Sequence, residues 1–370
     1  MKDSVEDIAA ILNLHTDSII FTNFFSEEDS KADFEFTPDT ISNVTKMPGA
    51  SNVTYKVDFK VNGNSHSIIY RKFTNKLVDF RIENLIFQTL SDNKEGPYCF
   101  YQCNKYRIEE YIPSRTISIF ELRNLNFMKE ITSHFASFHC NNRIQEGVTS
   151  LIESQKTCLE LFLENWWKQI KDKIKDIRNA LKRDDYSTIF EDFVSEYYRE
   201  GFEDYWRSLL PQCDDKIVAH TDAQETNILL LKAKPLKTAT IKCMLIDYEY
   251  AGIVERSWDL ANYYIETMLS NCEYDEYPWL QIYPENRMSP IELEQLVDYY
   301  IQAIIDLDGP TINRDEFLKE VKSMVVLINY YWGAWAMASL EMDTINDDDL
   351  YFEAAKIRLQ LIDIAKENLS

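Results

Sequence analysis

The chain has 370 residues, of which 45% are hydrophobic and 27% are charged, a composition that indicates a globular protein and excludes a disordered one. This length exceeds one ordinary core, so it predicts one large domain or two lobes that share a cleft. The formal net charge of −23 argues against a nucleic-acid partner and would instead attract a small cationic substrate.

The seven cysteines are scattered, without a C-x-x-C pair or a grouping with histidine at zinc-ligand spacing. This distribution favours the reduced cysteines of a cytosolic protein. The first residues, MKDSVEDIAAILN, are acidic and lack the apolar run of a secretory signal, and no stretch approaches the ~18 apolar residues of a membrane span. We therefore expect a cytoplasmic protein without a membrane span.

Residues 1–40 are expected to form an N-terminal extension with one short amphipathic helix. Residues 41–112 show mainly the patterns of strands. Apolar residues alternate with polar ones from Val53 to Val61, and Asn62-Gly63 then supplies a turn before the apolar run 67–73, which predicts a β-hairpin. The other elements expected in this segment are a helix over 78–90 and strands over 98–102 and 106–112.

After residue 112 helical patterns dominate, and a boundary there predicts a small β-rich lobe followed by a helical lobe over 113–370. The fold class is therefore α+β and bilobal. The expected helices cover residues 119–140, 150–182, 186–210, 290–306, 315–341 and 348–367. Two apolar runs in the centre of this lobe, 228–231 and 241–246, are read as strands.

The central stretch IVAHTDAQETNILLL, residues 217–231, carries the polar groups with the clearest chemical meaning. Asp222 and Asn227 are five residues apart in a loop that leads into a strand, the spacing with which kinases place a catalytic Asp and a metal-binding Asn. Asp247 follows the apolar run Met244-Leu245-Ile246, where a carboxylate is costly unless it is paired or bound to metal. Glu249 is two residues further on and would project to the same side of an extended backbone.

Phosphoryl transfer requires a carboxylate that orients the acceptor hydroxyl and ligands that hold magnesium and the phosphates. The alternative for each of these residues alone is an ordinary capping or turn role. The complete set, with its spacing and flanking strands, favours a phosphotransferase.

Three motifs in this region, HTDAQETNILL, IDYEYAG and ERSWDLANYYIE, resemble the signature of the choline/ethanolamine kinase family, usually written H-N-D-x4-N, I-D-F-E-Y and R-x-x-D-[IL]-x-N-x-x-x-E. Other stretches resemble its phosphate loop (PGASNVTYKV), its Arg-bearing strand (IIYRKF), its hinge (RIEEYIPSR) and two of its helices (ITSHFASFH and YYWGAWAM). The resemblance covers roughly residues 45 to 360. It implies a protein-kinase-like fold that phosphorylates choline or ethanolamine with ATP and Mg²⁺ and so feeds phospholipid synthesis.

By matching position, the resemblance implies that Asp222 is the catalytic base and that Gln224 lies beside it. Asn227 and Asp247 would be the magnesium ligands, with Glu249 assisting. His220 and Asp259 also match, and for them we expect a bracing role by hydrogen bonds.

The nucleotide residues implied by the resemblance lie in the first lobe. Ser51 and Asn52 would lie under the phosphates. Arg71 would replace the strand lysine of protein kinases and pair with Glu83. Backbone groups of Glu110 to Ile112 would meet adenine.

A quaternary ammonium cannot donate hydrogen bonds, so proteins recognise it with aromatic faces and a nearby carboxylate. The resemblance implies a pocket of such residues: Tyr250, Glu266, Trp332, Trp335 and either Tyr351 or Phe352. Without the motif, a tryptophan pair at i and i+3 of a helix would more often belong to a core.

The chain departs from the family pattern at several positions. Pro48 replaces a glycine of the phosphate loop, Thr221 replaces an Asn, and Tyr248 replaces a Phe. Lys72 follows Arg71 where a glycine is usual, which leaves the main phosphate-binding cation open. None of these changes removes a carboxylate or a metal ligand.

Two other functions remain open at the level of sequence: a related kinase of another hydroxyl compound, such as an aminoglycoside or a sugar amine, and a pseudokinase scaffold without transfer activity. Within the first interpretation, the aromatic set favours choline over ethanolamine. The partners expected are a small cationic amino alcohol and a second copy of the chain in a homodimer.

Overall fold

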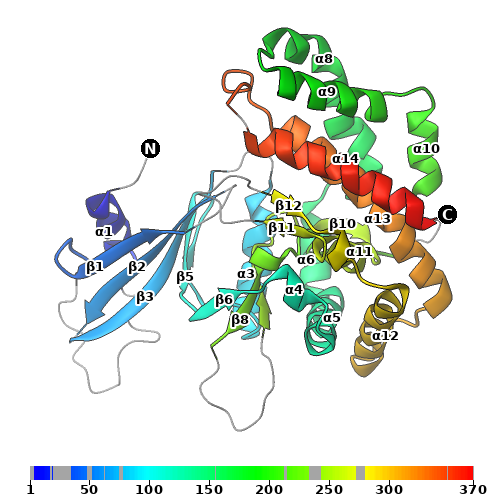
Figure 1. The fold of residues 1–370 in the computed structure, drawn as a ribbon. Coiled ribbons are helices and arrows are strands. Elements are labelled where there is room, and N and C mark those ends of the chain that lie inside the picture. Colours follow the sequence, from blue (N-terminus) through cyan, green and yellow to red (C-terminus); the bar gives the residue numbers. More distant parts are fainter. Residues whose placement is uncertain are drawn as a thin grey trace. The chain divides into compact units, whose positions relative to one another are not determined.

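The computed structural model describes residues 4–16, 19, 35–47, 52–61, 63–74, 78–154, 156–211, 215–232, 243–271, 280–347 and 349–369. The chain divides into two compact units, Met1–Ser114 and Arg115–Ser370 (Figure 1). The boundary expected at residue 112 lies two residues before the end of the first unit. The first unit is rich in strands and the second is mostly helical, so the expected α+β class is confirmed.

The first unit contains a five-stranded antiparallel sheet in the order β1-β2-β3-β5-β4. Its strands are β1 Ile41–Lys46, β2 Val53–Val61, β3 Asn64–Lys72, β4 Cys99–Gln102 and β5 Tyr106–Glu110. The β2–β3 hairpin is confirmed, with Val61 paired to Asn64 and Val53 to Lys72. Its turn contains Gly63 at φ 80°, a left-handed conformation that glycine adopts without strain. The second strand begins three residues earlier than the alternation predicted.

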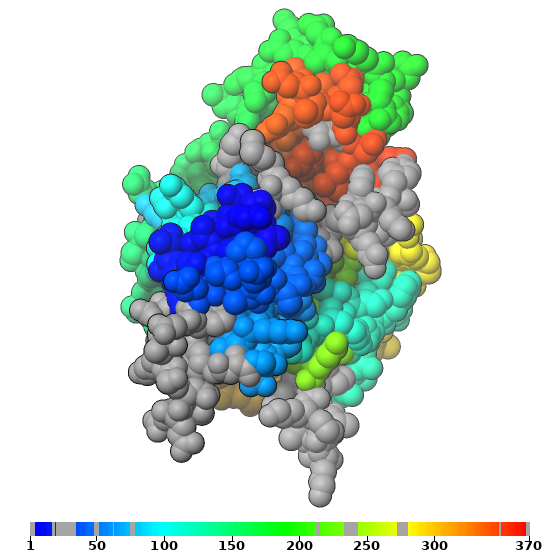
Figure 2. All heavy atoms as spheres, turned by 90° about the vertical axis from the view of Figure 1, so that its left-hand side faces the viewer, coloured from blue at the N-terminus to red at the C-terminus, as the bar shows by residue number. Residues whose placement is uncertain are grey.

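The N-terminal helix α1, Val5–Asn13, contacts β1, and Figure 2 shows its dark-blue atoms beside the blue atoms of the first strands. Its inner face is part of the core of this unit. Ile8 and Leu12 are fully buried in one cluster with the inward-facing side chains of β2, such as Val57. Asn13 joins the helix to the chain before β1, because its amide group both donates to Phe36 O (2.7 Å) and accepts from Phe36 N (2.6 Å). The segment expected to be a separate extension therefore contributes to the same core as the sheet.

The expected helix of the first unit is confirmed as α3, Phe80–Asp92. Asp79 caps it by accepting from the backbone N–H of Arg81 at 3.0 Å. Its buried face carries Ile82, Ile86 and other apolar residues at helical spacing, and Glu83 lies among them at 1% exposure. A buried carboxylate on this face requires a partner of opposite charge.

The second unit is built mainly from helices (Figure 1). They are α4 Ile119–Leu122, α5 Leu125–His139, α6 Asn142–Leu151, α7 Cys158–Phe162, α8 Lys168–Ala180, α9 Asp184–Tyr197, α10 Phe202–Leu209, α11 Trp258–Glu266, α12 Pro290–Asp306, α13 Arg314–Ala338 and α14 Asp349–Leu369. Every residue of α11 is buried, so this helix forms the centre of the unit. Among the described residues, no helix combines the length and the apolar character needed to cross a membrane.

The single helix expected over 150–182 is wrong, because the chain changes direction at its start and kinks within it. Ile152 is extended and ends α6, and Thr157 starts α7 with a capping box to Glu160. A π-helical turn, Leu163–Trp167, then leads into α8, with Asn165 outside helical geometry. Capping residues and the kink thus divide a stretch whose apolar spacing alone looks continuous.

The single helix expected over 186–210 is likewise two helices, α9 and α10. Gly201 separates them with φ 77°, a backbone conformation that a helix interior does not allow. The other long helices are confirmed as α12, α13 and α14, with ends within a few residues of those predicted.

Short strands of the second unit lead into the loops described below. They are β6 Ser114–Thr116, β7 Lys216–Ala219, β8 Ile228–Leu231, β9 Cys243–Leu245, β10 Gly252–Glu255, β11 Leu269–Asn271 and β12 Leu280–Ile282. β7 pairs with β10, β11 pairs with β12, and the remaining three strands form a sheet in the order β6-β8-β9. Only β8 and β9 were expected, from the apolar runs 228–231 and 241–246, and the other short strands were not predicted.

Candidate active site

The loop between β7 and β8 brings Asp222, Gln224 and Asn227 together. Gln224 Nε2 donates to Asp222 Oδ2 at 3.4 Å, and Asn227 Nδ2 donates to the same oxygen at 3.3 Å. Asn227 Nδ2 also donates to the backbone oxygen of Asp222 at 2.9 Å. The five-residue spacing read from the sequence thus corresponds to direct contact, because a short 3₁₀ turn, Glu225–Asn227, folds the loop back on itself.

Asp259, near the start of α11, holds this loop in place. Its Oδ1 accepts from the backbone N–H of Thr221 at 2.8 Å, and its Oδ2 accepts from the backbone N–H of His220 at 3.0 Å. His139 Nε2 lies 3.0 Å from Oδ2. Burial alone would raise the pKa of Asp259, but hydrogen bonding and charge from His139 and His220 lower it. Asp259 therefore remains ionised and fixes the two residues before Asp222.

His139 supports Asp259 from α5, a contact that no sequence pattern predicted. It is buried on α5, and its Nδ1 lies 2.8 Å from Tyr300 Oη on α12. Tyr300 also accepts from Arg256 Nη1 at 3.3 Å. The motif ITSHFASFH contains the only signal, a histidine at the end of an apolar helical face, and its partner Asp259 is 120 residues away.

Thr221 has φ 68°, in the left-handed region that β-branched residues rarely adopt. Two contacts hold it there: its Oγ1 donates to Tyr250 O at 2.7 Å, and its carbonyl accepts from Trp258 Nε1 at 2.9 Å. Asn, the usual residue here in the family that the motifs resemble, tolerates this conformation better. The surroundings thus impose a strained backbone directly before Asp222.

Asn227 and Asp247 lie at the same end of a two-stranded ladder. Asn227 precedes β8 and Asp247 follows β9, and the two strands are antiparallel. Ile246 N donates to Asn227 O at 3.0 Å, and the ring of His220 lies with Nε2 3.0 Å from Ile246 O. The extended backbone predicted from Asp247 to Glu249 is wrong, because Asp247 has φ 68°.

Five carboxylates nevertheless gather at this loop. The pKa of Asp222 is raised well above its ordinary value by burial and by the charges of Glu266, Asp247 and Glu249. Glu225, on the 3₁₀ turn, has its pKa raised to about 8 by burial and by Glu266, although hydrogen bonds from Asn271 lower it. A site with this much negative charge favours the binding of cations.

Four aromatic rings form one perpendicular array in this unit. The centroid of Tyr250 lies 5.2 Å from Trp332 and 6.0 Å from Trp335, with interplanar angles of 89° and 90°. Trp332 and Trp335 are 5.7 Å apart, and Trp335 lies 5.6 Å from Tyr351. Trp335 Nε1 donates to Tyr250 Oη at 3.1 Å. The tryptophan pair on α13 thus joins the tyrosine of the IDYEY motif, as the resemblance implied.

The structure separates the two aromatic candidates on α14. Tyr351 lies against Trp335, whereas Phe352 is fully buried and stacks on Tyr186 at 4.1 Å. Tyr351 is therefore the member of the array, and Phe352 belongs to the core.

Gly333 lies between the two tryptophans in the sequence of α13 and allows Tyr197 to approach this helix, since a Cβ there would lie 2.1 Å from Tyr197 Oη.

Glu266, the last residue of α11, is 1% exposed. Its Oε1 accepts from Arg358 Nη2 at 3.4 Å, and Arg358 Nη1 donates to Asn329 Oδ1 at 3.3 Å. Glu266 Oε2 and Trp332 Nε1 have no hydrogen-bond partner among the described residues. Burial raises the pKa of Glu266, and Arg358 opposes that rise. No sequence pattern indicated Arg358, which is one of three basic residues on α14, with Lys356 and Lys366.

In the first unit, Arg71 and Glu83 are connected through two further residues. Arg71 Nε lies 3.4 Å from Glu109 Oε1, Arg107 Nε lies 3.1 Å from Glu109 Oε2, and Arg107 Nη2 lies 3.0 Å from Glu83 Oε1. The Arg107 guanidinium also lies over the ring of Phe87 at 3.7 Å. Burial would lower the pKa of Arg107, but Glu109 and Glu83 raise it. The expected Arg71–Glu83 pair is thus extended into a buried chain of four charges.

The other predicted nucleotide residues are placed as follows. Asn52 is 8% exposed, and its Oδ1 accepts from Thr74 N at 3.1 Å. Ser51 lies outside the described residues. Glu110 N donates to Tyr98 O at 2.9 Å, so this amide is already part of the sheet edge. Ile112 O accepts from Ser114 Oγ at 2.9 Å.

A sequence model described as choline/ethanolamine kinase matches residues 44–363 of the chain. The choline kinase alpha of Mus musculus is 26% identical over 289 residues, which cover 75% of this chain and 59% of the mouse protein. The chain thus spans about three fifths of the length of that relative.

Two solved structures are similar over most of their length. The choline kinase from Cryptosporidium parvum Iowa II has a TM-score of 0.63 at 20% identity and covers 90% of this chain and 91% of that one. The Plasmodium vivax ethanolamine kinase has a TM-score of 0.66 at 16% identity, with coverages of 89% and 84%. At these identities the likeness shows the fold, and it confirms the expected architecture of a small β-rich part and a larger helical part.

Proposed function

The chain belongs to the choline/ethanolamine kinase family, and we propose that it transfers the terminal phosphoryl group of ATP to the hydroxyl of choline or ethanolamine. The observation that carries this proposal is the position of Glu266. Its buried carboxylate lies in the same unit as the Tyr250 and tryptophan array, it raises the pKa of Asp222, and one of its oxygens has no partner among the described residues. A cationic head group supplies the charge that this carboxylate requires.

In this proposal Asp222 orients the acceptor hydroxyl and takes its proton. A base must be ionised to do so, yet burial and the neighbouring carboxylates raise the pKa of Asp222. A bound cation near Glu266 or Asp247 weakens that repulsion and lowers the pKa again. Gln224 and Asn227 each donate to Asp222 Oδ2 and so fix the direction of the carboxylate.

The donor set around Asp247 fits Mg²⁺. Asn227 offers an amide oxygen, and Asp247 and Glu249 offer carboxylates, the oxygen ligands that this ion prefers. When bound, the ion neutralises the phosphate oxygens and holds them in line with the acceptor. Asp259 supports the arrangement indirectly, because it fixes the backbone of the loop that carries Asn227.

We further propose that Asn52, Arg71 and the edge at Glu110 to Ile112 bind the nucleotide. The buried chain from Arg71 to Glu83 supports this role, since it holds the Arg71 side chain against β5.

Choline is the preferred substrate in this proposal, because four aromatic rings suit a quaternary ammonium. The scattered cysteines favour the cytoplasm as the location, which fractionation of cells would test.

The test is a coupled assay of ADP release with a panel of choline, ethanolamine and an aminoglycoside. We expect magnesium-dependent turnover of choline, weaker turnover of ethanolamine and none of the aminoglycoside. Turnover of the aminoglycoside alone would replace the proposal with a related small-molecule kinase. ATP binding without turnover of either amine would replace it with a non-catalytic scaffold.

A further inference from the structure

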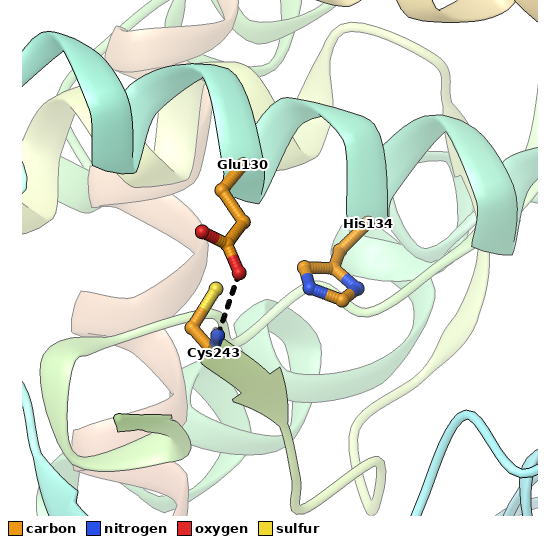
Figure 3. Close-up of side chains that lie close together, drawn as sticks. All are labelled: Glu130, His134 and Cys243. Carbon is orange, nitrogen blue, oxygen red and sulfur yellow. Dashed lines mark hydrogen bonds between the residues drawn. The ribbon is translucent and has the colours of Figure 1, made fainter. Parts of the chain in front are cut away.

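Glu130, His134 and Cys243 form a compact cluster in the second unit, apart from the groups assigned above (Figure 3). One ligand atom from each residue lies within 4.8 Å of those from the other two. Glu130 and His134 are half-buried, and Cys243 is 4% exposed. A carboxylate, an imidazole and a thiol are three of the side-chain types that bind zinc in proteins.

The geometry of this cluster follows from the elements that carry it. Glu130 and His134 are four residues apart on α5, so their side chains project from one side of the helix, as Figure 3 shows. Cys243 is the first residue of β9, which contacts α5. Glu130 Oε1 accepts from the backbone N–H of Cys243 at 2.7 Å and fixes the distance between helix and strand.

The sequence could not indicate this cluster, because its third member is 109 residues after the second. Pattern searches look for cysteine and histidine at short spacing, and the chain has none of that kind. Only the packing of β9 on α5 brings the thiol to the helical pair. The donor set of one nitrogen, one sulfur and one oxygen suits a borderline ion such as Zn²⁺ better than Mg²⁺, which prefers oxygen alone.

We propose that Glu130, His134 and Cys243 bind a Zn²⁺ ion that links α5 to β9. Ligands at about 2.0 to 2.3 Å from a tetrahedral ion lie about 3.3 to 3.8 Å from one another, so the three groups close by at most about 1.5 Å when the ion binds. A water molecule takes the fourth position. The thiol loses its proton to solvent on binding, and the thiolate becomes the ligand.

The location gives the ion a structural task, since α5 also carries His139, which contacts Asp259, and β9 leads to Asp247.

The experiment is titration of the purified chain with Co²⁺ as a spectroscopic substitute, followed by competition with Zn²⁺. A cobalt–thiolate bond gives a charge-transfer absorption in the near ultraviolet, which an oxygen-only magnesium site does not give. We expect this band in the wild type, its loss when one equivalent of Zn²⁺ is added, and its absence in Cys243→Ser. His134→Gln and Glu130→Gln should weaken the zinc affinity by at least the roughly 10–100-fold that loss of an outer-shell partner costs.

Two matched controls separate this site from others. Cys103→Ser removes a half-buried cysteine of the first unit and should keep the band, and Asp247→Ala removes a ligand of the proposed magnesium site and should also keep it. Circular dichroism of each variant verifies folding, and His134→Gln alone decides the question if Cys243→Ser does not fold. No thiolate band in the wild type, or an unchanged zinc affinity in His134→Gln, overturns the proposal whatever the kinase assay shows.

Discussion

Asp259 and Glu266 lie at opposite ends of the same buried helix, α11, and their surroundings differ. Asp259 accepts from two backbone amides and contacts His139, and these contacts hold its pKa low. Glu266 has one long contact to Arg358 and an oxygen without a partner among the described residues, and burial raises its pKa. A carboxylate whose hydrogen bonds are all made within the chain stabilises the fold. One that is buried and only partly satisfied costs stability and indicates a site for a ligand.

Asp259 fixes the loop that carries Asp222, and Glu266 raises the pKa of Asp222. Replacement of Asp222 should therefore have the largest effect. Asp222→Asn removes the base but keeps the size of the side chain, so we expect kcat for choline to fall roughly 10³–10⁴-fold. ATP binding, measured by calorimetry, should be largely unchanged. Turnover close to that of the wild type would show that Asp222 is not the base, and would leave the contrast between Asp259 and Glu266 without its proposed function.

The second largest effect is expected at Asp259, the residue of α11 that holds the loop before Asp222 in place. Asp259→Asn replaces one acceptor oxygen by an N–H₂ group that faces a backbone amide, and it leaves His139 without its anionic partner. We expect the free energy of unfolding to fall by about 3 kcal/mol, at the lower end of the cost of breaking a buried pair. Urea denaturation measures it. A loss below about 1 kcal/mol, near that of an ordinary hydrogen bond, would show that Asp259 is not the brace.

Substitution of Glu266, at the other end of α11, should change the stability in the opposite way. Glu266→Gln removes a buried charge that is poorly compensated, so the free energy of unfolding should stay the same or rise. The KM for choline should increase roughly 10–100-fold, because a charge pair shielded from water contributes about 1.4–2.7 kcal/mol. Asp259→Asn is the matched control, because its main expected effect is on the free energy of unfolding. A large loss of stability in Glu266→Gln, with the KM for choline unchanged, would show that Glu266 stabilises the fold and does not bind the substrate.

The aromatic array gives a smaller effect that depends on the substrate. Trp335→Ala removes one ring face, which is worth about 0.5–2 kcal/mol to a cation, so the KM for choline should rise roughly 2–30-fold. The KM for ethanolamine should rise less, because its ammonium also forms hydrogen bonds. Phe352→Leu is the control, since that ring stacks on Tyr186 in the core. Equal KM values for choline in Trp335→Ala and the wild type would show that the array is not the pocket.

Features that depend on residues close together in the sequence were predicted, and features that depend on residues far apart were not. The β2–β3 hairpin, α3 and the Asp222–Asn227 contact depend on neighbours within about a dozen residues, and periodicity or motif spacing was sufficient for them. The division of residues 150–182 depends on Thr157 and Asn165, single residues that override a continuous apolar spacing. His139, Arg358 and the chain from Arg71 to Glu83 depend on tertiary packing, which no local pattern contains.

Glu225 gives the smallest expected effect, and the direction of its pH dependence distinguishes a carboxylate whose pKa is raised from one, such as Asp259, whose pKa is lowered. Its pKa is raised to about 8 in the folded chain, whereas an unfolded Glu titrates near 4.5. Between these values the unfolded chain binds fewer protons than the folded one, so stability falls as pH rises from about 5 to 8. We expect Glu225→Gln to remove at least about 1 kcal/mol of that fall, measured by urea denaturation at several pH values. Asp259 should act in the reverse sense, because its lowered pKa adds stability that is present above the unfolded pKa and is lost as pH falls through the folded one. The same slope in Glu225→Gln and the wild type would mean that Glu225 is ionised in the fold and is held by Asn271 as firmly as Asp259 is held by His139.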